Sequence, residues 1–165
     1  MVRKELAGLL LSEVERFFPR ATTELKNWEN DFQFLVCIIL SAQTTDKQVN
    51  KITKELFKKY PVAKKLSMAK LEDLEYTLGG INYYRTKSKH IKEMAKILDS
   101  KFSGQPPKSI EKLVKLPGVG YKTANVFLND RYKANQGIAV DTHVLRVARA
   151  HGLTKNTNPT RVAHD

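Results

Sequence analysis

Residues 116–129 read L-P-G-V-G-Y-K-T-A-N-V-F-L-N, and this stretch decides how the rest of the chain is interpreted. Two glycines two positions apart break any helix before them, and the residues after Gly120 mix apolar and polar types at helical spacing. The segment that begins at Ser109 also has helical spacing, with Ser109 as the expected N-cap. The pattern therefore predicts two helices joined by a tight hairpin.

The hairpin glycines, Gly118 and Gly120, stand just before the N-terminus of the second helix. Backbone N–H groups there lack a partner within the helix, the dipole's positive end points outward, and glycine lets a phosphate approach the backbone. Pro117 fixes φ at the start of the turn, while Leu116 and Val119 can anchor it through apolar side chains. The pattern indicates a phosphate-binding helix-hairpin-helix motif, although an isolated GxG more often marks an ordinary helix C-cap.

Two residues in and after the motif have side chains suited to catalysis. Lys122 lies in the first turn of the second helix, where the dipole disfavours the ammonium form, and a free amine is a nucleophile. Asp141 comes between an apolar pair and a helical run that starts near Val144, a position typical of an N-cap. Capping alone is the alternative to a catalytic role for Asp141.

Three segments in this order resemble the endonuclease III family of the helix-hairpin-helix DNA glycosylase superfamily. They are L-S-A-Q-T-T-D at 40–46, L-P-G-V-G-Y-K-T-A-N-V at 116–126 and A-V-D-T-H-V-L-R-V at 139–147. The resemblance extends over residues 23–149. It implies an all-α, helix-hairpin-helix DNA glycosylase fold of two helical lobes.

We expect one helical domain over residues 22–135, with the motif at 109–129, and a second, incomplete lobe from residues 1–21 plus 136–165. Helical periodicity predicts nine or ten helices in all and no strand pairing. The clearest of the other helices cover residues 4–18 before Pro19, 32–42, the segment from Thr45 or Asp46 to Tyr60, 66–75, and a stretch ending near Phe102.

The resemblance implies a bifunctional DNA glycosylase and abasic-site lyase of base excision repair. Its substrate would be double-stranded DNA with oxidised pyrimidines, its nucleophile Lys122, and its sugar-cation stabiliser Asp141. A lysine at this position separates the chain from the adenine glycosylase branch, which lacks it, and from the alkylation-repair branch, which carries an aromatic there. The alternative is a catalytically silent DNA-binding module or an inactive shortened paralogue.

The matched motifs also imply contacts with DNA. Gln43 falls on the family residue that fills the gap left by an extruded nucleotide, and Asp46 on a residue beside the pocket. Local capping is the alternative for both. In the hairpin the implied DNA-binding residues are Leu116, Gly118, Val119, Gly120 and Thr123.

A wedge residue is expected after the glycine pair that ends at Gly80. Counting forward from Gly80 gives Ile81, and counting back from Lys87 gives Tyr83, so both alternatives stay open. Aromatic side chains at this turn, followed by Arg85, Lys87 and Lys89, suit insertion into a base stack beside phosphates.

Charge and size agree with a nucleic-acid partner. The 165 residues, 41% of them hydrophobic, provide for one compact unit or two closely packed lobes. Lys and Arg number 29 against 17 Asp and Glu, a net charge of +12. Such an excess suits a polyanion, either nucleic acid or an acidic membrane surface.

The single cysteine, Cys37, lies in an apolar run, which indicates a buried thiol and an intracellular, reducing location, the cytoplasm or nucleoid in a prokaryote. Members of the resembled family carry four cysteines after the Asp-Thr-His segment that bind an iron–sulfur cluster. We therefore expect no cofactor and no metal site in this chain.

The chain ends six residues after Pro159, soon after an Asn158–Pro159 helix start. We therefore expect a chain shortened relative to its family, with apolar residues of the first helix and of 144–148 partly uncovered. A monomer is the expected state, and self-association through these residues is the alternative.

Overall fold

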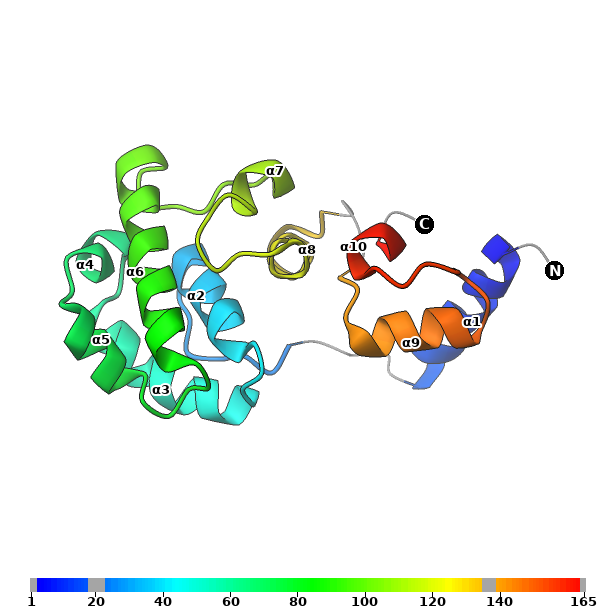
Figure 1. Ribbon diagram of the computed structural model, residues 1–165, viewed down its shortest axis with the longest axis horizontal. Helices are drawn as coiled ribbons and strands as arrows, with labels where there is room; N and C mark the ends of the chain where they lie inside the picture. The colour runs from blue at the N-terminus through cyan, green and yellow to red at the C-terminus, as the bar shows by residue number, and fades with distance from the viewer. Residues whose placement is uncertain (1–2, 18–22, 135–138, 164–165) are drawn as a thin grey trace. The chain divides into compact units, whose positions relative to one another are not determined.

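The structure is a computed structural model that describes residues 3–17, 23–134 and 139–163. No strand occurs in these ranges, which confirms the predicted all-α fold class. The helices of the described ranges are α1 (Arg3–Phe17), α2 (Asp31–Ser41), α3 (Asp46–Lys59), α4 (Ala63–Ser67), α5 (Leu71–Thr77), α6 (Tyr84–Lys101), α7 (Ile110–Leu113), α8 (Tyr121–Tyr132), α9 (Thr142–Ala150) and α10 (Pro159–Val162) (Figure 1).

The chain divides into two compact units. Glu24–Gln136 form the larger unit, which contains α2 to α8. Met1–Thr23 and Gly137–Asp165 form the smaller unit, with α1, α9 and α10. The hairpin and Lys122 therefore belong to the larger unit, and Asp141 belongs to the smaller one.

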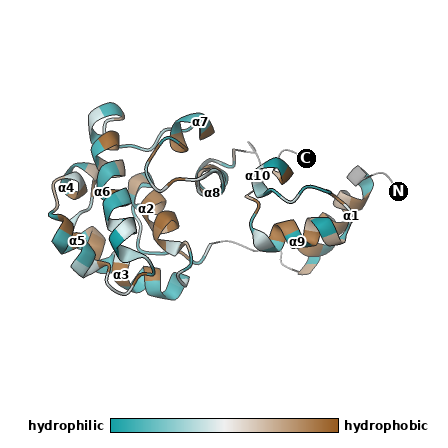
Figure 2. Ribbon diagram, in the orientation of Figure 1, coloured by the Kyte–Doolittle hydropathy of each residue, from teal (hydrophilic) through white to brown (hydrophobic). Residues whose placement is uncertain are grey.

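Helix α2 is the centre of the larger unit's core. Every residue from Phe32 to Leu40 is buried, as the continuous apolar run predicted, and Figure 2 shows this helix in the brown of apolar residues. The helix begins where the Asn30 side chain accepts a hydrogen bond from the Gln33 N–H at 3.0 Å. Helices α3, α6 and α8 pack against it. Because full burial of one Leu or Phe contributes about 1.5–3 kcal/mol, α2 strongly constrains the positions of all three.

The segment between α3 and α6 differs from the prediction. A single helix over 66–75 is wrong, because α4 ends at Ser67 and α5 begins at Leu71. The turn between them leaves Met68 75% exposed while Leu66 and Leu74 are fully buried. Both short helices pack against α6, so the break allows each to bury its own leucine.

Helix α7 is shorter than predicted but begins where expected. The Ser109 side chain accepts a hydrogen bond from the Lys112 N–H at 3.4 Å, which confirms its N-cap role. The helix ends at Leu113, and the Leu116 N–H then donates to the Leu113 carbonyl at 2.9 Å in a tighter turn. This turn directs Leu116, which is 3% exposed, into the core before the hairpin glycines.

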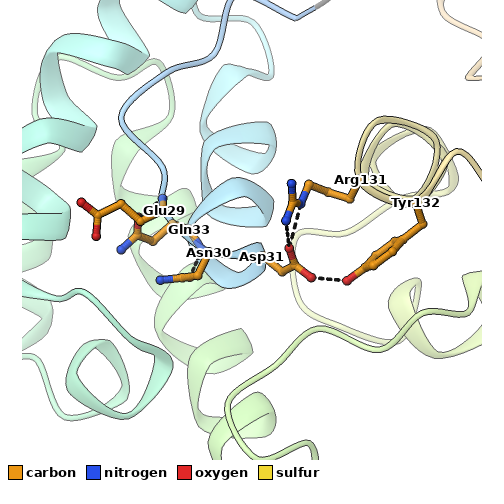
Figure 3. Close-up of polar contacts among 6 residues, drawn as sticks. All are labelled: Glu29, Asn30, Asp31, Gln33, Arg131 and Tyr132. Atoms are coloured by element: carbon orange, nitrogen blue, oxygen red, sulfur yellow. Dashed lines mark hydrogen bonds and ion pairs between the residues drawn. The ribbon is translucent and has the colours of Figure 1, made fainter.

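The start of α2 is tied to the end of α8 by a polar cluster around Asp31 (Figure 3). Arg131 Nε donates to Asp31 Oδ1 at 2.7 Å, its guanidinium pairs with the same carboxylate, and the Tyr132 hydroxyl donates to Oδ2. Arg131 also lies over the Trp28 ring, 4.8 Å from its centroid. Burial, together with the Asp31 carboxylate, raises the pKa of Tyr132 to about 12.

In the smaller unit, helix α10 begins at the Asn158–Pro159 pair, as the sequence predicts. Asn158 is the N-cap of α10, its side chain accepts from the Thr160 N–H at 2.9 Å, and Pro159 opens the helix. The predicted exposure of apolar residues holds on α1, where Leu9, Val14 and Phe17 are more than half exposed. It also holds for Val144 and Val147 of α9, which are 38% and 49% exposed, whereas Ala148 is buried. Pro19 lies outside the described residues, and self-association stays a prediction.

Across the described ranges, no helix combines the length and apolar composition needed to cross a membrane.

Replacing Asp31 by Asn should lower the free energy of unfolding by about 1.5–3 kcal/mol, the usual value of hydrogen bonds to a charged group. The amide keeps the shape of the carboxylate but not the charge that holds Arg131 and Tyr132. Urea denaturation followed by circular dichroism measures the change. Asp99→Asn, at an exposed position of α6, is the control and should change stability by less than about 0.5 kcal/mol. Equal effects of the two variants would show that the cluster is not stabilising.

Candidate nucleic-acid interface

The hairpin that the sequence predicted is a compact turn between α7 and α8. Leu116 and Val119 are 3% and 5% exposed, so their side chains anchor the turn in the core. The Val119 N–H donates to the Leu116 carbonyl at 3.1 Å, and Gly120 is the N-cap of α8. Any contact that Leu116 and Val119 make with DNA would therefore come from the backbone.

The structure requires glycine at one of the two hairpin positions but not at the other. Gly118 has φ +79°, and a Cβ added there would lie 3.0 Å from the His90 Cβ of α6. Gly120 has φ −88°, and a Cβ added there would have no atom within 4 Å. The fold thus requires glycine at 118, whereas at 120 the space beside the N-terminus of α8 is open.

Lys122 is the second residue of α8 and is exposed, and Thr123 beside it is half-buried. The apolar residues Ala124, Phe127 and Leu128 on the other side of the helix are buried. Packing of this apolar face against α2 fixes the rotation of α8. The lysine is therefore held at the surface, close to the hairpin glycines.

Asp141 is the N-cap of α9, as predicted. Its Oδ1 accepts hydrogen bonds from the backbone N–H groups of His143 and Val144, both at 2.9 Å. The residue is half-buried, directly after the buried Val140. The cap fixes the position of the carboxylate relative to α9, since two donors from the helix hold one of its oxygens.

Two loops of the larger unit carry the other candidate residues. Gln43 follows α2 with φ +55°, and Thr45, two residues later in the same loop, is the N-cap of α3, whose first residue is Asp46. Tyr83 precedes α6 with φ +59° and is 67% exposed, whereas Ile81 is 2% exposed and belongs to the core. Of the two residues considered as a wedge, only Tyr83 has its side chain at the surface.

A set of hydrogen bonds joins these two loops. The Asn82 amide donates to the Gln43 carbonyl, and the Asn82 N–H donates to Thr44 Oγ1 at 3.2 Å. From α3, Gln48 Nε2 donates to the Gly80 carbonyl at 3.1 Å. The backbones that carry Gln43 and Tyr83 are therefore held together.

Lys87 does not lie at the surface, where the sequence pattern places it. Its spacing from Arg85 and Lys89 suggested a phosphate contact, but the side chain is 6% exposed and points inward. Burial lowers the pKa of its ammonium group. A signal was present in the helical period, because Lys87 precedes the buried Ile91 by four residues and Met94 by seven.

The residues present do not fit the iron–sulfur cluster that the family resemblance implies. Such a cluster takes four thiolates, and the chain has one cysteine. Cys37 is fully buried in α2, and burial raises the pKa of its thiol to about 12. Within the residues that the structure describes, no group of three His, Cys, Asp or Glu side chains could hold a metal ion.

Known proteins with similar sequences are endonucleases III. The chain is 38% identical to that of Synechocystis sp. over 163 residues, which cover 99% of this chain and 74% of the relative. It is 40% identical to that of Bacillus subtilis over 145 residues, which cover 88% of this chain and 65% of the relative. The chain thus spans about two thirds to three quarters of these proteins.

Solved structures give the same result. A non-covalent endonuclease III–DNA complex has a TM-score of 0.89 and 37% identity, covering 99% of this chain and 76% of that one. A trapped endonuclease III–DNA covalent intermediate has a TM-score of 0.90. The predicted helix-hairpin-helix DNA glycosylase fold is thereby confirmed. A family model described as HhH-GPD superfamily base excision DNA repair protein matches residues 36–165. The chain therefore belongs to this superfamily, as its three motifs predicted.

Proposed function

We propose that this protein is a bifunctional DNA glycosylase and abasic-site lyase that acts on oxidised pyrimidines in duplex DNA. The observation that carries the proposal is the exposed Lys122 at the N-terminus of α8, directly after an open glycine turn. The relatives described as endonuclease III–DNA complexes support DNA as the partner.

The larger unit offers a surface suited to a DNA backbone. The N–H groups at the start of α8 and the open space at Gly120 suit a phosphate. The net charge of +12 favours binding of the protein to a polyanion such as DNA. Gln43 and Tyr83 would act at the damaged base pair, filling and separating the stack once the nucleotide has been extruded.

In the proposed reaction, the unprotonated Nζ of Lys122 attacks C1′ of the extruded nucleotide. The C1′–N glycosidic bond breaks, and the base leaves with the electron pair and takes up a proton. Nζ then loses a proton, the C1′–O4′ bond breaks and O4′ takes up a proton, so that opening of the sugar ring leaves a protonated Schiff base between Nζ and C1′. Loss of a proton from C2′ then expels the 3′ phosphate by breaking the C3′–O bond, which cuts the strand. The Asp141 carboxylate stabilises the positive charge that develops on the sugar and assists proton transfer.

A second candidate function is a DNA-binding module without catalysis. It is favoured by the open backbone at Gly120, because the N–H groups at the start of α8 suit a phosphate whether or not Lys122 reacts. Both candidates predict binding to duplex DNA with strong salt dependence, so binding does not separate them. Covalent trapping does.

Lys122→Ala should abolish the adduct that borohydride traps between the protein and duplex DNA with an abasic site, while binding to undamaged duplex changes little. The reason is that only an amine at C1′ gives a reducible Schiff base. Lys112→Ala removes an exposed lysine from α7 and is the matched control, which should still form the adduct. Absence of the adduct in the unaltered protein would favour the silent module.

Asp141→Asn should slow single-turnover base release by about 10²-fold or more, the usual effect of losing one stabilising group in a reaction centre. The amide oxygen can still accept from His143 and Val144, so the cap and the melting temperature should be preserved. Asp99→Asn again provides the charge-matched control. If Asp141→Asn releases base at the normal rate, the role of Asp141 is capping alone.

Gly120→Ala should weaken duplex binding about tenfold, because its methyl group would separate a phosphate from the N–H groups of α8. Its effect on stability should stay within about 1 kcal/mol, the difference between glycine and alanine at an N-cap. Gly118→Ala should instead lower the melting temperature of the protein, because the backbone at Gly118 is left-handed and His90 lies against it. Fluorescence anisotropy and thermal melting measure the two effects. Unchanged affinity in Gly120→Ala would rule out phosphate binding at this turn.

A further inference from the structure

Among the charged residues whose burial the structure describes, Lys87 of α6 is the one that is buried. Its helix neighbours toward the core, Ile91, Met94 and Leu98, are all apolar and fully buried. An apolar side chain would fill this position without the desolvation that an ammonium group suffers. The presence of a lysine therefore needs an explanation from what its charge contacts.

The Lys87 ammonium group donates to three oxygen atoms. They are the carbonyls of Leu40 at 2.9 Å and Ala42 at 2.6 Å, and the Thr44 hydroxyl at 3.4 Å. An ammonium group has three N–H donors, so all of them are satisfied. Two of these acceptors lie at the C-terminal end of α2, where carbonyls lack helical partners and the dipole is negative.

The same contacts extend to the loops that carry Gln43 and Tyr83. Thr44 Oγ1, which Lys87 approaches, also accepts the Asn82 N–H, and the Asn82 side chain donates to the Gln43 carbonyl. Gln43 and Tyr83 both have left-handed backbone conformations, at φ +55° and +59°. Such conformations are costly for residues other than glycine and persist only where surrounding contacts hold them.

We infer that Lys87 is a positioning residue, which holds the Gln43 loop and the Tyr83 loop in one fixed arrangement so that both side chains enter the DNA stack together. This inference rests on the proposed function. Lys87 itself is buried and does not contact DNA. Its loss should leave the electrostatic binding of undamaged duplex unchanged and impair only the step in which the base pair is opened.

The test uses a duplex with a tetrahydrofuran abasic-site analogue opposite 2-aminopurine, whose fluorescence rises when it is unstacked. The analogue lacks the C1′ oxygen, so no Schiff base can form and the signal reports the opening step alone. Lys87→Met keeps the length of the side chain but removes its donors. The matched control is Lys96→Met, which makes the same substitution at an exposed position of α6.

In Lys87→Met, the fluorescence rise and kcat for base release should each fall about tenfold, as expected for loss of a charge-assisted contact. KM and the salt dependence of binding to undamaged duplex should match the unaltered protein. Lys96→Met should reproduce the unaltered protein in fluorescence and kcat. The amount of undamaged duplex bound at saturation should also be unchanged, which distinguishes positioning from a general loss of folded protein, because unfolded protein would lower kcat and the amount of duplex bound together.

Asn82→Ala keeps the test decisive if Lys87→Met fails to fold. Asn82 is exposed, so its removal cannot open the core, yet it breaks the side-chain contact with the Gln43 carbonyl. This variant should also show reduced fluorescence with normal duplex affinity. Normal fluorescence and kcat in folded Lys87→Met, or in Asn82→Ala if Lys87→Met does not fold, would overturn the inference.

An unaltered protein that binds the duplex without any rise in fluorescence would also overturn the inference. If instead the fluorescence rises, and falls in the variants, while borohydride traps no adduct, the positioning role stands and only the proposed chemistry fails.

Discussion

Helix α2 is buried along nearly its whole length, so the polar groups at its two ends must find partners inside the protein. At its start, the Asp31 carboxylate forms an ion pair with Arg131 and accepts a hydrogen bond from Tyr132, both of α8. At its end, the Leu40 and Ala42 carbonyls receive the ammonium group of Lys87 from α6. The negative charge of Asp31 lies at the positive N-terminal end of the α2 dipole, and the positive charge of Lys87 lies at its negative C-terminal end, so both interact favourably with the dipole. Burial of α2 therefore dictates where α6 and α8 lie. Tyr83 immediately precedes α6, and Gly120 and Lys122 lie at the start of α8, so the positions of these expected DNA contacts follow from it.

The sequence predicts the parts of the fold that follow from local pattern. The apolar run of α2, the end of α6 near Phe102 and the N-caps Ser109, Asp141 and Asn158 all depend on neighbours close along the chain, and all occur as predicted. The family follows from three short motifs, and the matching family model covers residues 36–165. These features need no knowledge of tertiary contacts.

What the sequence did not reveal depends on contacts between distant segments. The partners of Lys87 lie more than forty positions earlier in the chain, so charge alone placed this lysine at the surface. The choice between Ile81 and Tyr83 required knowing which side chain the core accepts. The helix predicted over 66–75 divides into α4 and α5 because both pack against α6. The hydrophobic periodicity within the segment does not indicate this packing. The roles of Lys122 and Asp141 in catalysis depend on a substrate and stay predictions.

The burial of Cys37 has a practical consequence. Thiol reagents attack the thiolate, and this thiol is fully enclosed with its pKa raised to about 12. The folded protein should therefore be silent toward alkylating dyes, and each labelling event should report an opening of α2 away from its neighbours. Since the chain has no second cysteine, the labelling rate measures the free energy of that opening at a single point in the core, without an engineered probe.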